Sequence, residues 1–263
     1  PGEALYISAD LSHLWLATTQ HAHRLDNPLG GGVGSALFTC DGDVAGPLWV
    51  DEGRDVLYCA PMAGSKIHVW PNASTAPLYS SSDPARTIVL AGAQIFGLTG
   101  DATANRLYVR VSDGSQQSIA VLDNASGLNG AVTPGAVMTG LGASDGSMTG
   151  LAYARQQDVL YLGRPQAIGI VTAASTRTGP VALRLVQGAA TGIVNEPVSL
   201  DVFGDDDVLI VGDVDGAVLA FTNASTLVGN VAFAKQDSPV RALVTIVAWP
   251  EPAAAAAWVP RQR

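Results

Sequence analysis

Lysine is nearly absent from this sequence, which contains only Lys66 and Lys235 among its 263 residues. Charged residues of all kinds make up 14% of the chain, and the formal net charge is −9. Binding to a phosphate backbone or an anionic membrane surface requires clustered Lys and Arg side chains, and this sequence has no such cluster. We therefore expect no nucleic-acid partner. A surface with so few charges suits a subunit of a larger assembly.

Long apolar runs and helix-forming stretches are also missing. The longest apolar run, "ALVTIVAW" at 242–249, ends at Pro250 and is far shorter than the roughly 18 residues that a membrane span requires. The 29 Gly and 15 Pro disfavour long helices, so an all-β fold is expected. No charged start followed by an apolar segment occurs at Pro1, so we expect either a cytosolic protein or one whose export signal has been removed.

Internal repetition is the strongest positive feature of the sequence. Five segments align, each an apolar run after a polar turn: "HLWLA", "VLYCA", "RLYVR", "VLYLG" and "VLIVG". Their central residues, Trp15, Tyr58, Tyr108, Tyr161 and Ile210, are separated by 43, 50, 53 and 49 residues. One apolar stretch before each turn and two more after it give four short strands per unit. This period predicts an all-β fold, a β-propeller of four-stranded antiparallel blades.

The pattern covers the chain as one propeller domain at 1–263. The repeat units lie at about 4–41, 43–92, 93–142, 143–190 and 191–244. The fourth strand of the fifth unit is expected in "VRALV" at 240–244. Trp258 falls 48 residues after Ile210, which predicts a partial unit at 245–263. We therefore favour six blades with a shortened last blade over five blades plus a C-terminal extension.

A two-stranded last blade would leave one strand edge unpaired. The stretch "AAAAAWV" carries no charge, and only Pro252 and Pro260 flank it, so little protects this edge from pairing with another chain. We expect a neighbouring subunit to cover it by strand addition. The residues of this assembly edge are Ala253, Ala257, Trp258 and Val259.

The triplet Asn-Ala-Ser occurs after the third strand of three units, at Asn72, Asn124 and Asn223. Asn27 and Ala173 occupy the aligned positions of the other units. An Asn there can bond its own backbone two residues on, and the following Ser can do so more weakly, which predicts a fixed turn into the fourth strand. Glycosylation is the alternative interpretation, and it requires secretion through a eukaryotic-type pathway.

The unit reads approximately "D-x-L-Y-V-x … I-x-V-x-x-N-A-S-T … P-x-R-x-I-x-G" and is clearest in "DVLYCA", "KIHVWPNAST" and "DPARTIVLAG" of the second unit. It resembles the repeats of bacterial secreted or surface β-propellers related to the NHL and YVTN groups. The resemblance implies a protein of the extracellular space, the cell surface or the periplasm. Those groups include binding scaffolds, surface proteins and some enzymes. Units one and four depart from the pattern, with "LDNPLG" and "VTAAS".

Propellers usually bind ligands at the rim of the central channel, where inner strands begin or end. Polar residues expected near that rim are Gln94, Asp145, Asn195 and Glu196, with Asp10 and Asp51 at the far ends of inner strands. We expect a non-enzymatic scaffold, without a resident cofactor, that binds a protein partner or self-assembles. The alternative is a metal-assisted lactonase or lyase: in lactonase-like relatives Glu, Asn and Asp hold a divalent cation such as calcium. That likeness implies ligand roles for Asp145, Asn195 and Glu196.

Three further clusters have an ordinary structural explanation. His21 and His23 lie two residues apart on a strand, as a metal pair would, but the chain has only four His, so hydrogen-bonded rings are expected. An acidic run suits turn chemistry better than a calcium loop; it contains Asp205, Asp206, Asp207, Asp213 and Asp215. Cys40 and Cys59 are expected as buried free thiols, with a disulfide as the alternative.

Overall fold

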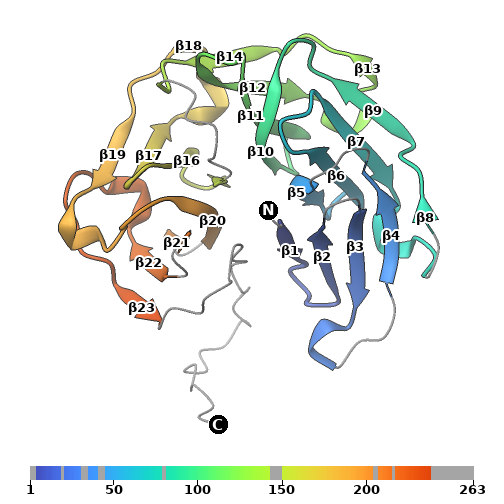
Figure 1. The fold of residues 1–263 in the computed structure, drawn as a ribbon, viewed down its shortest axis with the longest axis horizontal. Helices are drawn as coiled ribbons and strands as arrows, with labels where there is room; N and C mark the ends of the chain where they lie inside the picture. Colours follow the sequence, from blue (N-terminus) through green and yellow to red (C-terminus); the bar gives the residue numbers. More distant parts are fainter. Residues whose placement is uncertain are drawn as a thin grey trace.

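The structure is a computed structural model that describes residues 4–18, 21–30, 35–40, 45–78, 81–142, 150–203, 207–214 and 217–237. These residues form five sheets around a common centre, which makes a β-propeller of five blades, numbered one to five along the chain (Figure 1). The prediction of an all-β propeller with antiparallel blades is confirmed. Within the described part of the chain, no helix is long and apolar enough to cross a membrane.

Each blade contains four antiparallel strands, which follow one another outward from the centre of the ring. The innermost strands are β1 (Leu5–Ile7), β5 (Ala45–Asp51), β10 (Gln94–Asp101), β15 (Leu151–Ala154) and β20 (Pro197–Phe203). The second strands are β2 (His13–Ala17), β6 (Val56–Pro61), β11 (Arg106–Ser112), β16 (Val159–Arg164) and β21 (Val208–Asp213). The third strands are β3 (His21–Asp26), β7 (Lys66–Pro71), β12 (Gln117–Asp123), β17 (Ala167–Thr172) and β22 (Val218–Thr222). The fourth strands are β4 (Ser35–Thr39), β9 (Arg86–Val89), β14 (Ala136–Thr139), β19 (Arg184–Gln187) and β23 (Lys235–Asp237).

The five aligned central residues do occupy one place in the repeat. Each lies in the middle of a second strand, opposite equivalent residues of the first and third strands. Short 3-10 helices follow the third strands: η1 (Pro28–Gly30), η2 (Ala73–Thr75), η3 (Ala125–Gly127), η4 (Ala174–Thr176) and η6 (Ala224–Thr226). A further one, η5 (Ala189–Thr191), lies between blades four and five. The repeat period therefore gave the correct strand alignment.

The preference for six blades is wrong, because the structure shows five. The predicted partial unit at 245–263, with its assembly edge at Ala253, Ala257, Trp258 and Val259, lies outside the described residues. The prediction of that unit depended on the spacing of Trp258 from Ile210 and on an apolar strand and a turn before Trp258. Residues 245–263 contain no Asp, Asn or Ser, which close the hairpins and turns of the other units.

The fourth strand of blade five also differs from the prediction. It is β23, at Lys235–Asp237, and not the "VRALV" stretch at 240–244, which lies outside the described residues. In blades two to four the fourth strand begins 11 to 14 residues after the left-handed residue that follows the third strand. Lys235 lies 12 residues after Asn223 and fits that interval. Hydrophobicity misplaced a strand that the distance from the turn would have located.

Both faces of the central strands are buried, which explains their continuous apolar runs. All six residues of β6 are buried. Val56 and Tyr58 belong to the apolar cluster that β6 shares with blade three, whereas Leu57 and Cys59 belong to the cluster shared with blade one. Alternate side chains of one strand therefore face different blades, and no polar alternation remains in the sequence.

Neighbouring blades also share backbone hydrogen bonds. Three two-residue strands, β8 (Ser81–Ser82), β13 (Gly130–Ala131) and β18 (Gly179–Pro180), pair in parallel with the fourth strand of the preceding blade. An isolated parallel bridge between Gly229 and Val186 repeats the arrangement between blades five and four. Blades two to five thus each add an outer segment to the blade before them, a feature that the sequence analysis did not predict.

The buried hydroxyl of Tyr58 gives a first prediction. Within the described part of the chain it has no hydrogen-bond partner, and burial together with the nearby Asp51 carboxylate raises the Tyr58 pKa well above its ordinary value. We expect Tyr58→Phe to stabilise the protein by about 1 kcal/mol, because it removes a buried, unsatisfied donor. Tyr153→Phe is the matched control: its hydroxyl donates to Asp158 Oδ1 at 3.0 Å, so the variant should lose stability. Urea denaturation measures both, and a less stable Tyr58→Phe would contradict the prediction.

Candidate functional site

One side of the ring, which we call the channel rim, carries the starts of the inner strands and the hairpins that join second to third strands. The hairpin of blade two contacts the first residues of β10. The Ile95 amide donates to the Gly64 carbonyl at 2.8 Å, and the Ala63 amide donates to the Ile95 carbonyl at 3.0 Å. These bonds hold the start of β10 and leave the Gln94 side chain exposed.

Asn195 and Glu196 lie on the same rim, in the connection between blades four and five. The buried Asp213 carboxylate, at the end of β21, holds the backbone of this connection. Its Oδ2 accepts the backbone N–H of Val194 at 3.1 Å and that of Asn195 at 3.2 Å. A hairpin bond from the Gln166 amide to the Asn195 carbonyl, at 2.5 Å, adds a contact from blade four. The backbone of this rim segment is therefore held from two blades.

Two exposed valines flank these polar side chains. Val194 is 61% exposed and Val214 is 55% exposed. Both lie next to Asp213: the Val194 amide donates to its carboxylate, and Val214 is the next residue in the chain. The Val214 amide also donates to the Glu196 carbonyl at 2.9 Å. An apolar pair beside an exposed Asn195 and a half-buried Glu196 forms the surface that we call the valine rim.

The structure separates some of the predicted rim residues. Gln94 belongs to blade three, whereas Asn195 and Glu196 precede blade five, so blade four lies between them. Asp145 lies outside the described residues. Among the described residues, no group of three or more His, Cys, Asp or Glu side chains could hold a metal ion. The ligand roles of Asp145, Asn195 and Glu196 stay a prediction.

At the opposite ends of the inner strands, Asp10 and Asp51 stabilise turns. Asp10 Oδ1 accepts the Ser12 hydroxyl at 2.6 Å, the Ser8 hydroxyl at 2.7 Å and the Ser12 amide at 2.9 Å. These hydrogen bonds lower the pKa of Asp10 to about 2. The buried Asp51 pairs with the Arg54 guanidinium at 3.0 Å. Both carboxylates are therefore used within their own turns.

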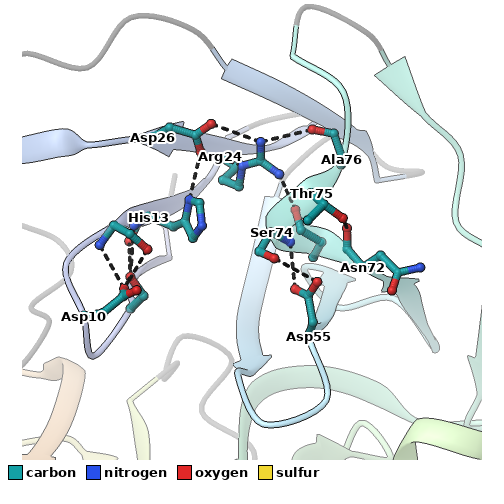
Figure 2. Close-up of polar contacts among 12 residues, drawn as sticks. Asp10, His13, Arg24, Asp26, Asp55, Asn72, Ser74, Thr75 and Ala76 are labelled. Atoms are coloured by element: carbon teal, nitrogen blue, oxygen red, sulfur yellow. Dashed lines mark hydrogen bonds and ion pairs between the residues drawn. The ribbon is translucent and has the colours of Figure 1, made fainter.

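On this turn side of the ring, the Ser two residues after the left-handed position forms hydrogen bonds that we call the turn lock, shown for Ser74 and Asp55 of blade two in Figure 2. In blade two the Ser74 amide and hydroxyl donate to Asp55 at 2.7 and 2.8 Å. Ser175 bonds Asp158 in the same way, Ser225 bonds Asp207, and Ser126 donates its amide to Asn105. In all four blades these bonds connect the hairpin between the first and second strands to the 3-10 turn after the third strand.

The lock confirms the structural interpretation of the triplet but corrects its chemistry. Asn72, Asn124 and Asn223 make no capping bond with their side chains. They adopt left-handed backbone angles, with φ between 51° and 55°, which Asn tolerates better than most residues. The Ala that follows each of them is buried. The Ser, predicted as a weak local acceptor, makes the long-range bonds.

A charged cluster joins blade one to blade two (Figure 2). Arg24 Nε donates to Asp26 Oδ1 at 2.7 Å, and His13 Nδ1 lies 2.8 Å from the same oxygen. The Arg24 guanidinium also donates to the carbonyls of Ala73 at 2.5 Å and Ala76 at 3.0 Å in the next blade. Burial acts to raise the Asp26 pKa, but the bonds from Arg24 and His13 outweigh it and hold that pKa below its ordinary value.

The His13–Asp26 pair resembles part of a hydrolytic triad, but the nearby hydroxyls have another partner. Ser8 and Ser12 both donate to Asp10. A nucleophilic Ser would need its hydroxyl bonded to the second imidazole nitrogen. The cluster therefore serves the junction between the blades.

An arginine also crosses each of the next three junctions along the chain, from blade two to blade five. Arg106 donates to the Ser175 carbonyl at 2.7 Å, from blade three to blade four. Arg86 reaches the Ser126 carbonyl and Arg184 reaches the Ser225 carbonyl in the blades that follow them. The Ser of each of these 3-10 turns thus bonds an Asp or Asn of its own blade, and its carbonyl accepts a bond from an arginine of the preceding blade. Four arginines, Arg24, Arg86, Arg106 and Arg184, therefore join neighbouring blades.

The histidine pair and the described residues of the acidic run have the structural roles that the sequence analysis expected. His21 and His23 lie on β3 with ring centroids 6.0 Å apart, and burial lowers the pKa of His23, as does the neighbouring His21. Of the acidic run, Asp207 forms a turn lock and Asp213 anchors the rim; Asp205, Asp206 and Asp215 lie outside the described residues.

The two cysteines are closer than expected. Their two strands need not be neighbours across a blade interface, yet the Cys40 and Cys59 sulfur atoms lie 2.9 Å apart. Both are free thiols in the structure.

Comparison with known proteins adds no family assignment. No protein-family model matches the chain, and no curated protein matches it either.

Proposed function

We propose that this protein is a non-enzymatic propeller scaffold that binds a partner protein outside the cytoplasm through the valine rim. The observation that carries the proposal is the exposure of Val194 and Val214 beside Asn195 and Glu196, on a backbone held by Asp213. Burying exposed apolar side chains contributes favourable free energy to association. An ordered backbone loses little entropy on binding.

The chemistry of this surface defines the partner that fits it. An apolar patch should cover the two valines, and polar groups should border it next to the exposed Asn195. The resemblance of the repeat to surface and secreted propellers supports a partner in the extracellular space, the periplasm or the cell envelope. A second copy of the chain is one form that this partner can take.

A pair of charge insertions tests the proposal. The wild-type protein and the Val194→Asp/Val214→Asp variant are immobilised and exposed to protein from the native source, and retained proteins are identified by mass spectrometry. We expect the double variant to lose at least about tenfold of the partner signal, because two carboxylates would be buried at the contact.

Val228→Asp is the matched control, since Val228 is 61% exposed but follows η6 on the turn side of blade five. It should bind like the wild type. Equal retention by the wild type and the double variant would overturn the proposal, as would loss of binding in Val228→Asp alone. A wild-type protein that retains nothing above background also counts against it.

A metal-assisted lactonase or lyase is the second candidate function. Asn195 and Glu196 favour it because they are consecutive oxygen-bearing residues on the rim, and oxygen ligands suit calcium. Elemental analysis of the purified protein separates the two functions. About one calcium or zinc ion per chain, lost in Glu196→Gln, would support the enzyme. Metal-free protein that still binds its partner through the valine rim would support the scaffold.

A further inference from the structure

The only two cysteines of the chain meet at the junction between blades one and two. Cys40 directly follows β4 of blade one, and Cys59 lies within β6 of blade two, 19 residues further along the chain. They are 4% and 0% exposed. Their sulfur atoms, 2.9 Å apart, are closer than two sulfurs in ordinary van der Waals contact.

The surroundings of the pair are apolar. Both cysteines belong to the hydrophobic cluster shared by blades one and two, together with Phe38, Leu57 and Trp70. Cys59 is held inside the sheet of blade two, where it pairs with Leu48 of β5 and His68 of β7. Cys40 is the residue directly after β4 and is buried in the same cluster. The fold therefore delivers two thiols from different blades to one point, and a covalent bond between them requires a further approach of less than about 1 Å.

We propose that Cys40 and Cys59 are a disulfide-forming pair that staples blade one to blade two under oxidising conditions. The oxidant is a low-molecular-weight disulfide such as oxidised glutathione. The thiolate of one cysteine attacks a sulfur of the reagent, forms a mixed disulfide and releases one reduced thiol. The second cysteine then attacks the protein sulfur of that mixed disulfide, and the internal S–S bond forms as the second reduced thiol leaves.

Two electrons pass in this exchange from the protein sulfurs to the reagent, and the two thiol protons end on the two released thiols. The reaction should be slow. Contact with Cys40 and burial raise the pKa of the Cys59 thiol well above its ordinary value, and the thiolate is the reactive form. Exchange should therefore accelerate as the pH rises towards mildly alkaline values.

The staple should stabilise the ring. It closes a loop of about 20 residues, which in the chain-entropy model restricts the unfolded state. The expected difference between the oxidised and the reduced protein is about 6–12 °C in Tm. This inference concerns the junction of blades one and two and does not depend on the valine rim or its partner.

Thiol counting tests the proposal directly. The folded wild-type protein is equilibrated with oxidised glutathione at mildly alkaline pH, quenched with acid, denatured and alkylated, and its intact mass is measured. We expect no alkylated cysteine, no glutathione adduct and the loss of two hydrogen atoms. A digest should contain one cross-linked peptide that joins Cys40 to Cys59. Adding a reductant should restore both thiols and lower Tm by the amount above.

Single variants supply the control. Cys40→Ala and Cys59→Ala should each keep one alkylatable thiol or gain one glutathione, with a Tm that a reductant does not lower. Where a variant fails to fold, the oxidised and reduced wild type decide the question alone. Two alkylatable thiols after equilibration, or stable glutathione adducts without an internal bond, would overturn the proposal.

Discussion

Adding one methyl group at Gly163 should destabilise the protein by about 3 kcal/mol. A Cβ on Gly163 would overlap the backbone carbonyl oxygen of Pro197, at the start of the inner strand of blade five. That oxygen belongs to the backbone and cannot rotate away as a flexible side chain would. We expect Gly163→Ala to push blades four and five apart, with a lower urea midpoint as the measurable result.

Other contacts at the same point make this movement costly. The Gly163 amide donates to the Gly150 carbonyl at 2.9 Å. The Gly163 carbonyl accepts a bond at 2.9 Å from Arg110, a buried cation of blade three. Blades three, four and five therefore meet at one residue, and a shift that relieves the Pro197 overlap would weaken these bonds and expose part of a buried guanidinium.

Gly127→Ala is the control for the methyl group itself. Gly127 ends η3, its φ is not in the left-handed region, and no heavy atom lies within 4 Å of the added Cβ. Its stability should change by less than about 0.5 kcal/mol. If Gly163→Ala unfolds at the same urea concentration as Gly127→Ala, the junction is looser than the backbone geometry indicates.

Local chemistry explains which parts of the fold could be predicted. The second strands were found because burial on both faces produces apolar runs, and the polar hairpins before them are fixed by residues next to each other in the chain. The short parallel strands could not be found, because two residues such as Gly130–Ala131 show no periodicity. Their pairing depends on the preceding blade.

The turn lock left a signal that could have been used. An Asp or Asn directly precedes the second strand in four units, at Asp55, Asn105, Asp158 and Asp207, and a Ser always follows two residues after the left-handed position. The rim offered no such signal. Nothing local in the sequence connects Asp213 to the amides of Val194 and Asn195, almost 20 residues earlier, because only the folded hairpin of blade five brings them together.

Removing the carboxylate of Asp158 should cost roughly 3 kcal/mol, and it tests the lock where it is most complete. Asp158 Oδ1 accepts the Ser175 amide at 2.7 Å and the Tyr153 hydroxyl at 3.0 Å, and its Oδ2 accepts the Ser175 hydroxyl at 2.7 Å. Asp158 also has a φ of 52°, a conformation that Asp tolerates and Ala disfavours. Asp158→Ala therefore loses three hydrogen bonds and gains backbone strain, and urea denaturation should report both.

Asp158→Asn separates the geometry of the lock from its charge. Asn105 occupies the equivalent position in blade three, where its Oδ1 accepts the Ser126 amide at 2.9 Å and its φ is 54°. An Asn at 158 can keep the amide bond and the left-handed backbone, so it should cost only about 1 kcal/mol. If Asn is as damaging as Ala, the negative charge stabilises this turn more than its hydrogen-bond geometry does. The turn of blade three would then be held by the crossing Arg86 rather than by its own lock.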